Sequence, residues 1–533
     1  MMLAVAGTNQ QNLNEQVLDI LSRCNHLNHL KQLQSFLVTL GHSNSQFYVF
    51  KLLRFCTLKL PDLAYARFIF NHLHHPNIYL YTAMLTAYAS QSDPTSAFAF
   101  YRHMVRRGRP APNQFIYPHV LKSTPQVSVP YGTKLVHAAI VKSGFCQYPV
   151  VQTALVDSYS RSGSHIGIAR ELFDEMSERN VVSWTAMVSG YARAGELGDA
   201  LSLFEEMPDK DVPSWNAIIA GCTQNGMFPE AISLFRRMIF EGRQHHLNRP
   251  NQVTIVCTLS ACGHTGMLQL GKEIHAYVYR KSFGLDSFIS NAMVDMYGKC
   301  GNLKEARIVF EIIPKKSLTS WNSMINCFAL HGQSEWAISV FEEMMQLEEC
   351  DVRPDYITFI GLLNACTHGG LIEKGITYFD LMTKKYGIQA RIEHYGCLVD
   401  LLCRAGRFKE ALDVVRTMKI EPDEVVWGSL LNGCKKYGRA DLAEFAIQKL
   451  IELDPNNGGY GTMLANLYGE LGKWDQVRKV RKILKERDTP KIPGCSWIEV
   501  DNQVHQFYSV DKSHPRTEDI YMTLDKIDFE VQF

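Results

Sequence analysis

The chain has 533 residues, of which 46% are hydrophobic and 20% charged, so it can bury a large core and does not belong to the intrinsically disordered class. Lysine and arginine number 55 and aspartate and glutamate 54, which excludes a protein held on nucleic acid mainly by bulk charge but not a reader of single-stranded bases. No run of about 18 apolar residues occurs, and this excludes a transmembrane helix.

Residues 1–13 form a short N-terminal segment that contains no acidic residue, no arginine and no serine. Because an organellar transit peptide is acid-poor but rich in arginine and serine, this segment is at most a weak targeting peptide. The secretory pattern of a charged region followed by an apolar one is absent as well. The 14 cysteines are sparse and never spaced C-x-x-C, so we expect a reducing compartment rather than a disulfide scaffold or a zinc site with adjacent ligands.

An internal repeat fills residues 14–423. Glycines recur at intervals of 31–40 residues, and most are followed at fixed distances by a small residue, a bulky one and a methionine, as in Gly195, Ala200, Phe204 and Met207. A period of this length is the signature of a repeat architecture. The recurring glycines are Gly163, Gly195, Gly226, Gly266, Gly301, Gly332, Gly370, Gly406, Gly438 and Gly472.

Each unit is predicted to be a pair of helices. In Val182–Ala194 the apolar residues follow one helical stripe, and Gly195 suits the left-handed conformation that ends a helix. A second helix is predicted over Leu197–Met207. One such hairpin cannot bury its apolar faces alone but stacked hairpins can, so the pattern predicts an all-α fold, an α-solenoid with a concave surface.

The stretches VVSWTAMVSGYARAGELGDALSLFEEMPDKD (181–211) and NAMVDMYGKCGNLKEARIVFEIIP (291–314) resemble pentatricopeptide repeats. Unit lengths near 31, 35 and 36 residues resemble the plant PLS subfamily, and the resemblance implies a right-handed superhelix of helix-turn-helix units. The expected units are about 14–46 (degenerate), 47–77, 78–113, 114–148, 149–180, 181–211, 212–251, 252–286, 287–317, 318–355, 356–391 and 392–423. Two insertions, at 241–250 and 346–354, are expected to lengthen the loops between units.

The end of the chain departs from the repeat. Residues 424–491 resemble the two E-type hairpins, E1 and E2, that follow the array in this subfamily, and 492–533 resemble an E+ type extension, the start of a truncated DYW deaminase domain. Zinc deaminases carry an H-x-E … P-C-x-x-C signature, and neither half of it occurs. The sequence therefore predicts no catalytic residue, no metal and no cofactor, and a protein that is not an enzyme.

Polar residues recur at the fifth position and at the last position of the units. Asparagine or threonine can meet a Watson–Crick edge, and repeat proteins of this type read one base per repeat with two or three side chains. The alternative is that such residues only cap the first helix of a unit. The candidate base-reading pairs are Thr82 with Asn113, Thr153 with Asn180, Thr185 with Asp211, Asn216 with Asn251, Asn291 with Ser317, and Asn322 with Asp355.

By resemblance to the family, threonine with asparagine favours adenine, threonine with aspartate favours guanine, asparagine with aspartate favours uracil, and asparagine with asparagine or serine favours a pyrimidine, more often cytosine. From unit 78–113 onward the implied target is A-n-A-G-Y-n-C-U-n-n. The insertion in unit 212–251 could displace Asn251 from its place. In the longer units the fifth residues Pro118, Val256 and Ile360 cannot bond a base edge and are interpreted as spacers.

Residues 473–491 hold eight basic and three acidic residues. They are either a solvated helix face or a contact with RNA phosphates through Lys473, Arg478, Lys479, Arg481, Lys482 and Lys485. Cys262, Cys300, Cys366, His264 and His368 also recur at fixed positions, and for the cysteines packing in the hairpin core is favoured over a metal or nucleophile role.

The resemblance implies a site-recognition factor for C-to-U editing of organellar transcripts. Its implied partners are single-stranded organellar RNA, a DYW-type deaminase acting in trans and multiple organellar RNA-editing factors, with no membrane and no DNA. Its expected location is a plant organelle, the mitochondrion rather than the chloroplast. The alternatives are an RNA-binding factor for organellar splicing, processing or stability, and a helical scaffold for protein partners; a hydrolase is disfavoured because no nucleophile–base motif occurs.

Overall fold

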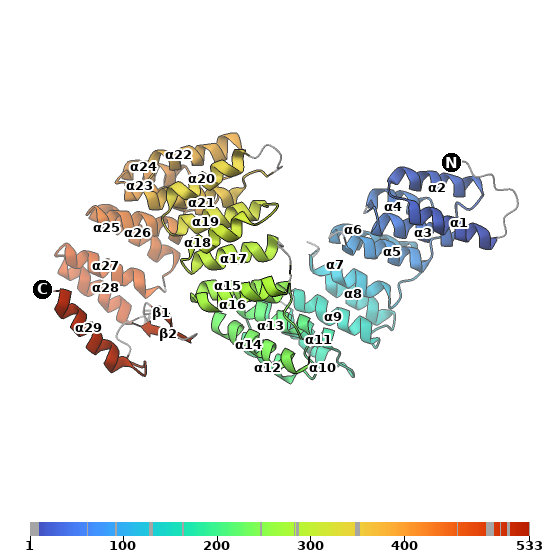
Figure 1. Ribbon diagram of the computed structural model, residues 1–533, viewed down its shortest axis with the longest axis horizontal. Coiled ribbons are helices and arrows are strands. Elements are labelled where there is room, and N and C mark those ends of the chain that lie inside the picture. Colours follow the sequence, from blue (N-terminus) through green and yellow to red (C-terminus); the bar gives the residue numbers. More distant parts are fainter. Residues whose placement is uncertain are drawn as a thin grey trace. The chain divides into compact units, whose positions relative to one another are not determined.

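The computed structural model describes residues 10–531 except 61, 91–92, 127–131, 163–164, 246–247, 282, 284–286, 347–351, 456, 487–494, 501–502 and 509–511. Within this described part the chain consists almost entirely of helices that follow one another in pairs (Figure 1), which confirms the predicted α-solenoid class. The helices divide into two compact units. The first runs to Asn225 and takes in His245–Asn248, and the second comprises Gly226–Gln244 and the chain from Arg249 onward.

Thirteen helices lie before Asn225, in the described part of the first compact unit, and a turn of 3-10 helix joins them. They are α1 (Gln10–Arg23), α2 (Leu27–Thr39), α3 (Gln46–Leu58), α4 (Leu63–Asn71), α5 (Ile78–Ser90), α6 (Pro94–Arg107), α7 (Ile116–Ser123), η1 (Thr124–Gln126), α8 (Gly132–Lys142), α9 (Pro149–Arg161), α10 (Ile166–Asp174), α11 (Val181–Ala194), α12 (Leu197–Glu206) and α13 (Val212–Gln224). The helices predicted over Val182–Ala194 and Leu197–Met207 are thus confirmed, each within one residue. Residues 10–13 belong to α1, and the rest of the expected N-terminal segment lies outside the described residues.

The remaining elements follow Gly226. They are α14 (Phe228–His245), α15 (Gln252–Thr265), α16 (Leu268–Arg280), α17 (Ser287–Lys299), α18 (Leu303–Glu311), α19 (Leu318–Leu330), α20 (Ser334–Gln346), α21 (Tyr356–Gly369), α22 (Ile372–Asp380), the π-helical turn η2 (Leu381–Lys385), α23 (Ile392–Arg404), α24 (Phe408–Thr417), α25 (Glu424–Lys436), α26 (Ala440–Leu453), α27 (Gly458–Glu470), α28 (Trp474–Glu486), β1 (Cys495–Val500), β2 (Gln503–Tyr508) and α29 (Thr517–Val531). No described helix is long and apolar enough to cross a lipid bilayer.

Glycine marks the end of the first helix in each described pair from α11 onward. Gly195 follows α11 with φ 82°, in the left-handed region where a side chain would be strained. The other glycines predicted from the repeat, from Gly226 to Gly472, also have positive φ, while Gly163 lies outside the described residues. The glycine period therefore reports a helix terminus.

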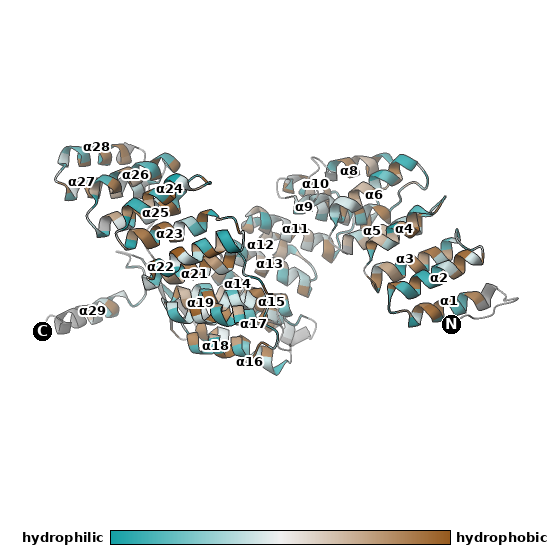
Figure 2. Cartoon of the chain, turned by 90° about the horizontal axis from the view of Figure 1, so that it is seen from above, coloured by the Kyte–Doolittle hydropathy of each residue, from teal (hydrophilic) through white to brown (hydrophobic). Residues whose placement is uncertain are grey.

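Neighbouring hairpins are held together by aromatic pairs. A phenylalanine from the second helix of one hairpin meets, edge to face, the fourth residue of the next first helix; Phe310 of α18 lies 5.1 Å from Trp321 of α19. The same geometry recurs in the pairs Phe70–Tyr81, Phe173–Trp184 and Phe204–Trp215, at 4.8–5.0 Å. Hydrophobic and hydrophilic residues alternate around each helix accordingly (Figure 2).

Consecutive first helices also approach each other closely. A Cβ placed on Gly221 of α13 would lie 2.5 Å from the Cβ of Ala192 in α11, so only glycine fits there. This contact keeps consecutive first helices side by side, and with them any residues that share a helical position.

The first half of the insertion at 241–250 is helical and does not form the predicted loop, whereas residues 248–250 are not helical. Helix α14 continues through its first half and ends only at His245, which makes α14 an 18-residue helix. The reason is local, because no proline or other strong helix-breaking residue precedes Pro250 beyond Gly242. The second insertion lies largely in 347–351, outside the described residues.

The C-terminal segment adds the two strands of the described chain. β1 and β2 pair antiparallel from Cys495 opposite Tyr508 to Val500 opposite Gln503, and α29 follows them (Figure 1). The described side chains of this segment are mostly exposed, in contrast to the cores of the helical pairs.

Candidate nucleic-acid interface

The six predicted fifth-position residues occupy the same place in six helices. Thr82, Thr153, Thr185, Asn216, Asn291 and Asn322 are each the fifth residue of α5, α9, α11, α13, α17 and α19. Their predicted partners lie just before the first helix of the following hairpin. The fifth residues are therefore inside the first turns and do not cap them.

The partner residues are helix caps. Asn180 Oδ1 accepts a hydrogen bond from the backbone N–H of Ser183 at 2.9 Å, and Asp211, Asn251, Ser317 and Asp355 do the same for α13, α15, α19 and α21. Asn113 accepts from two backbone N–H groups before α7. The capping interpretation thus holds for the closing residues. Asn251 caps α15 like the others, so the insertion before it has not displaced it from the helix start.

Two of the capping side chains also form a hydrogen bond with the fifth residue of the preceding hairpin. Asn180 accepts with its Oδ1 and at the same time donates from Nδ2 to the Thr153 hydroxyl at 3.1 Å. Asp355 caps α21 and also accepts from Asn322 Nδ2 at 3.0 Å. In these two units the structure brings the predicted pair into direct contact.

In three other units the two members of the pair are not joined. Within the described residues no hydrogen bond links Thr82 to Asn113, Thr185 to Asp211, or Asn291 to Ser317. Asn216 and Asn251 belong to different compact units. The six pairs therefore occupy equivalent positions in the repeat, but only some of them are joined by a hydrogen bond.

The threonine hydroxyls all point the same way. Those of Thr82, Thr153 and Thr185 donate to the backbone carbonyl four residues earlier, at 2.8–2.9 Å. Because each hydroxyl proton is donated to a backbone carbonyl, the hydroxyl oxygen can only accept a hydrogen bond from a ligand. An acceptor of this kind suits a base that presents an amino or imino hydrogen.

A row of exposed apolar side chains lies three residues before the fifth positions. They occupy the second position of the first helices, where a soluble helix would normally be polar, and range from 37% to 69% exposed. This row was not predicted, because an apolar residue at a helix start reads as part of the core. Its members are Phe47, Tyr79, Val150, Val182, Val253, Phe288, Ile357 and Val425.

One member of this apolar row and one fifth-position residue line the same groove between α3 and α5. The groove has a volume of about 360 Å³, and both Tyr79 and Thr82 line it. An exposed ring and a polar side chain therefore face the same space, as a stacking and hydrogen-bonding site for a planar ligand requires.

The last turns of the first helices carry a row of basic residues at the thirteenth position. The row comprises Arg161, Arg193, His264, Lys299, His368, Arg404 and Lys436. Three of them form ion pairs with an aspartate one turn earlier, as Lys299 does with Asp295 at 2.8 Å. The sequence analysis noted the recurrence of His264 and His368 but did not predict a row of basic residues at this position.

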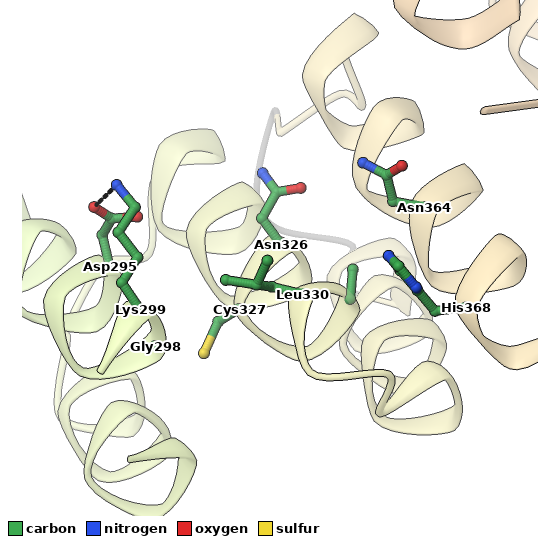
Figure 3. Close-up of a pocket in the computed structure, with 9 residues that line it drawn as sticks. Asp295, Gly298, Lys299, Asn326, Cys327, Leu330, Asn364 and His368 are labelled. Carbon is green, nitrogen blue, oxygen red and sulfur yellow. Dashed lines mark hydrogen bonds and ion pairs between the residues drawn. The ribbon is translucent and has the colours of Figure 1, made fainter. Parts of the chain in front are cut away.

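Part of this row opens on a pocket of about 260 Å³ (Figure 3). Asp295 and Lys299 come from α17, Asn326 and Leu330 from α19, and Asn364 and His368 from α21. Elsewhere in the row, burial and, second to it, the nearby Arg161 lower the pKa of the Arg193 guanidinium, while Asp157 raises it. An anion beside Arg193 would favour its charged form.

The predicted phosphate contacts lie at α28. Lys479, Arg481 and Lys482 are exposed, whereas Arg478 pairs with Asp475 at 2.6 Å and Lys473 lies 3.8 Å from Glu444. The side chain of Lys485 lies outside the described residues. The cations thus line an exposed helix, and their contact with RNA remains a prediction.

Two of the three recurring cysteines pack in the hairpin cores, and the third, Cys300, is half-buried. Cys262 and Cys366 are fully buried, and burial raises the pKa of Cys366 to about 11, which makes it a poor nucleophile. His264 stacks on Phe228 with the ring centroids 4.4 Å apart. Across the described chain no group of three or more potential metal ligands gathers.

Repeated hairpins with aligned rows of apolar, polar and basic side chains define a helical-repeat binding protein. A family profile described as PPR repeat matches residues 79–109, 182–212, 213–243, 288–318, 319–348, 357–386 and 393–421, and one described as E motif matches 437–499.

Among its relatives, the chain is 62% identical over 520 residues to the Arabidopsis thaliana pentatricopeptide repeat-containing protein At1g33350, covering 97% of this chain and 96% of that one. It is 35% identical over 532 residues to the Arabidopsis thaliana protein At1g59720, named chloroplastic/mitochondrial, covering 97% and 77%. Its fold resembles the crystal structure of the pentatricopeptide repeat protein PPR10 from maize, with a TM-score of 0.52 and 16% identity over 88% of this chain and 78% of that one. The chain belongs to the pentatricopeptide repeat family, and it is a repeat protein rather than an enzyme.

Proposed function

We propose that the chain binds single-stranded RNA sequence-specifically and acts as a site-recognition factor for C-to-U editing of organellar transcripts, recruiting a deaminase in trans. The observation that carries RNA reading is the register of the first helices. An exposed apolar residue at position two and a polar one at position five occur together in four first helices, α5, α9, α11 and α17. Such a row offers each base a surface to stack on and a group to bond.

The basic row supplies the sequence-independent part of binding. Exposed or half-exposed cations at position thirteen, such as Lys299 and Arg404, can exchange their aspartate partners for phosphate groups. The cations of α28 extend this contact beyond the array. Base preferences follow the pairs described above, so the preferred target is A-n-A-G-Y-n-C-U-n-n.

The E motif favours editing over other RNA-processing roles. It matches residues 437–499, after the last matched repeat at 393–421, and includes most of β1; β2 and α29 follow it. We assign to 424–533 the surface on which a DYW-type deaminase and other editing factors assemble, because the E motif match lies within this segment. The location proposed is a plant organelle, the mitochondrion before the chloroplast.

The test uses a plant null mutant complemented with either the full chain or a chain that ends at residue 423. The full chain should restore C-to-U conversion at a cytosine four nucleotides 3′ of the base aligned with unit 392–423. The shortened chain should still bind the target RNA, with an affinity reduced only by the share of α28, and should restore no editing.

Two outcomes would redirect the proposal. Full editing with the shortened chain would reject the recruitment role and promote a function in splicing, processing or stability. A full chain that binds no RNA in a titration with the predicted target would instead favour a scaffold for protein partners.

A further inference from the structure

Units 287–317 and 318–355 both present an asparagine at the fifth position, but they differ in what meets its side-chain oxygen. Asn322 Oδ1 accepts a hydrogen bond from the Thr358 hydroxyl at 2.7 Å. Asn291 Oδ1 is buried and accepts none from any described residue. Because a buried acceptor without a partner is costly, this difference changes what each asparagine offers a ligand.

The orientation of the Asn322 amide is fixed by the chemistry of its neighbours. The Asp355 carboxylate can only accept, so the nitrogen end of the amide must face it, at 3.0 Å. The Thr358 hydroxyl accepts from the Asp355 backbone N–H at 3.1 Å, and its own proton faces two acceptors, Asn322 Oδ1 at 2.7 Å and Asp355 Oδ1 at 3.0 Å. The contact with Asn322 is the shorter of the two. With Asn322 only 5% exposed, this arrangement is shielded from water.

Unit 287–317 has the same layout with a different outcome. Ser317 stands where Asp355 stands, and Ser320 is the third residue of its helix, as Thr358 is of α21. The Ser320 hydroxyl accepts from the Ser317 backbone N–H at 3.1 Å and lies 3.0 Å from the Ser317 hydroxyl. It is therefore engaged with the cap and does not reach Asn291.

We infer that Thr358 is a positioning residue that sets the base preference of unit 318–355. By satisfying Asn322 Oδ1, it leaves the second amide N–H, which donates to no described residue, as the group offered to a base. A donor selects a keto oxygen, as in uracil, over an amino group, as in cytosine. Asn291 has no such partner, so its oxygen, which is buried in the unbound chain, is an unmatched acceptor and is expected to favour an amino group once RNA binding exposes it.

This inference rests on the proposed RNA-binding function but goes beyond the pairs of that proposal, since it assigns a third residue from the following hairpin. It also explains from hydrogen-bond donors alone why two asparagine-led units differ in preference.

The experiment measures Kd for two RNAs that differ only in U or C at the nucleotide aligned with unit 318–355. The full chain should prefer U. Thr358→Val, which keeps the shape and removes the hydroxyl, should lower the U-to-C preference by about fivefold or more, because the freed Oδ1 now accepts from the cytosine amino group. Thr358→Ser should retain the preference. If Thr358→Val does not fold, Thr358→Ala removes the same hydroxyl with less bulk and carries the same expectation.

Ser214→Ala is the matched control. Ser214 is also the third residue of its helix, and its hydroxyl accepts from the Asp211 backbone N–H at 3.0 Å, but it donates to a backbone carbonyl and not to a fifth residue. This variant should leave the U-to-C preference at unit 318–355 unchanged.

Equal losses of affinity for both RNAs in Thr358→Val would show that Thr358 only stabilises the helix start, and would overturn the inference while leaving the proposed function intact. A wild-type chain without any preference for U over C at this nucleotide would overturn base reading by this unit, and the inference with it.

Discussion

The two ends of the first helices are built in opposite ways. At the first turn of α19 and α21 the polar groups are buried or half-buried and tied into one network, in which Asp355 Oδ1 accepts from Asn322 Nδ2 and from the backbone N–H and the hydroxyl of Thr358, while Asn322 Oδ1 accepts from the same hydroxyl. At the last turn of α17 and α23 the polar groups are paired ions that reach solvent, with Lys299 29% and Arg404 51% exposed.

The difference teaches which property each end can control. Buried hydrogen bonds have fixed geometry and a high cost when one partner is lost, so the first turn can discriminate between base edges. Exposed ion pairs contribute little to stability and exchange partners freely, so the last turn suits phosphates of any sequence. Stability and sequence preference should therefore respond to the first turn, and salt dependence to the last.

Asp355→Ala should have the largest effect on stability. It removes the cap of α21 and leaves the buried Asn322 amide nitrogen without its acceptor, which should lower the free energy of unfolding by about 2–3 kcal/mol. Denaturant unfolding followed by circular dichroism measures this. Asp380→Ala, which removes an exposed ion-pair partner at the end of α22, is the control and should change stability by less than about 0.5 kcal/mol. Equal effects of the two variants would break the comparison.

Phe288→Ala should weaken RNA binding. The ring is 58% exposed at the second position of α17, so its loss should cost about 1–3 kcal/mol of binding free energy through lost base stacking. Ile308→Ala is matched to it, because Ile308 is 55% exposed on the second helix of the same hairpin. Fluorescence titrations that find the same affinity for both variants would contradict a stacking row.

Lys299→Ala should act on salt dependence. Since one phosphate contact is lost, the slope of log K against log salt should fall in magnitude by about 0.7, with the same change for every RNA sequence. The free energy of unfolding should change by less than about 1 kcal/mol, because the pair with Asp295 is solvent-accessible. Lys384→Ala, which breaks a similar pair in η2, should leave the slope unchanged. If Lys299→Ala instead lowers the affinity for some RNA sequences more than for others, Lys299 contacts a base and not only a phosphate.

The smallest expected effect is a pH dependence of one first turn. His394 stands at the third position of α23, where other helices carry serine or threonine, and burial lowers its pKa. Its Nδ1 accepts from the Arg391 backbone N–H, so the neutral ring is the folded form. Its contribution to stability is complete above the unfolded pKa of about 6.5 and is lost as the pH falls below that value.

His394→Asn should therefore flatten the fall in stability between neutral pH and the acid side, as measured by the denaturation midpoint at each pH. His103→Asn, a change at an exposed position of α6, serves as the control. An unchanged pH profile in His394→Asn would show that other groups govern acid sensitivity.

The sequence predicted what depends on local chemistry. Gly195 and its counterparts placed the helix ends, and the polar residues at fifth and closing positions could be found by counting from them. What depends on stacking could not be predicted. The cap formed by Asn180 is local, but its contact with Thr153 spans 27 residues and exists only because two hairpins lie side by side. Likewise, the apolar character of Val182 suggests a core residue, but no neighbouring hairpin covers its side chain, which is 62% exposed.

The division of each polar pair between two hairpins bears on how such proteins change over generations. Asn322 and Asp355 are 33 residues apart: Asn322 lies near the start of its own hairpin, and Asp355 caps the first helix of the next hairpin. An unequal crossover in the gene that removes or duplicates one hairpin leaves every surviving helix with a fifth residue and a cap, yet gives some of them new partners. A single recombination event thus produces a new series of pairs, together with a longer or shorter array, before any amino acid has been substituted.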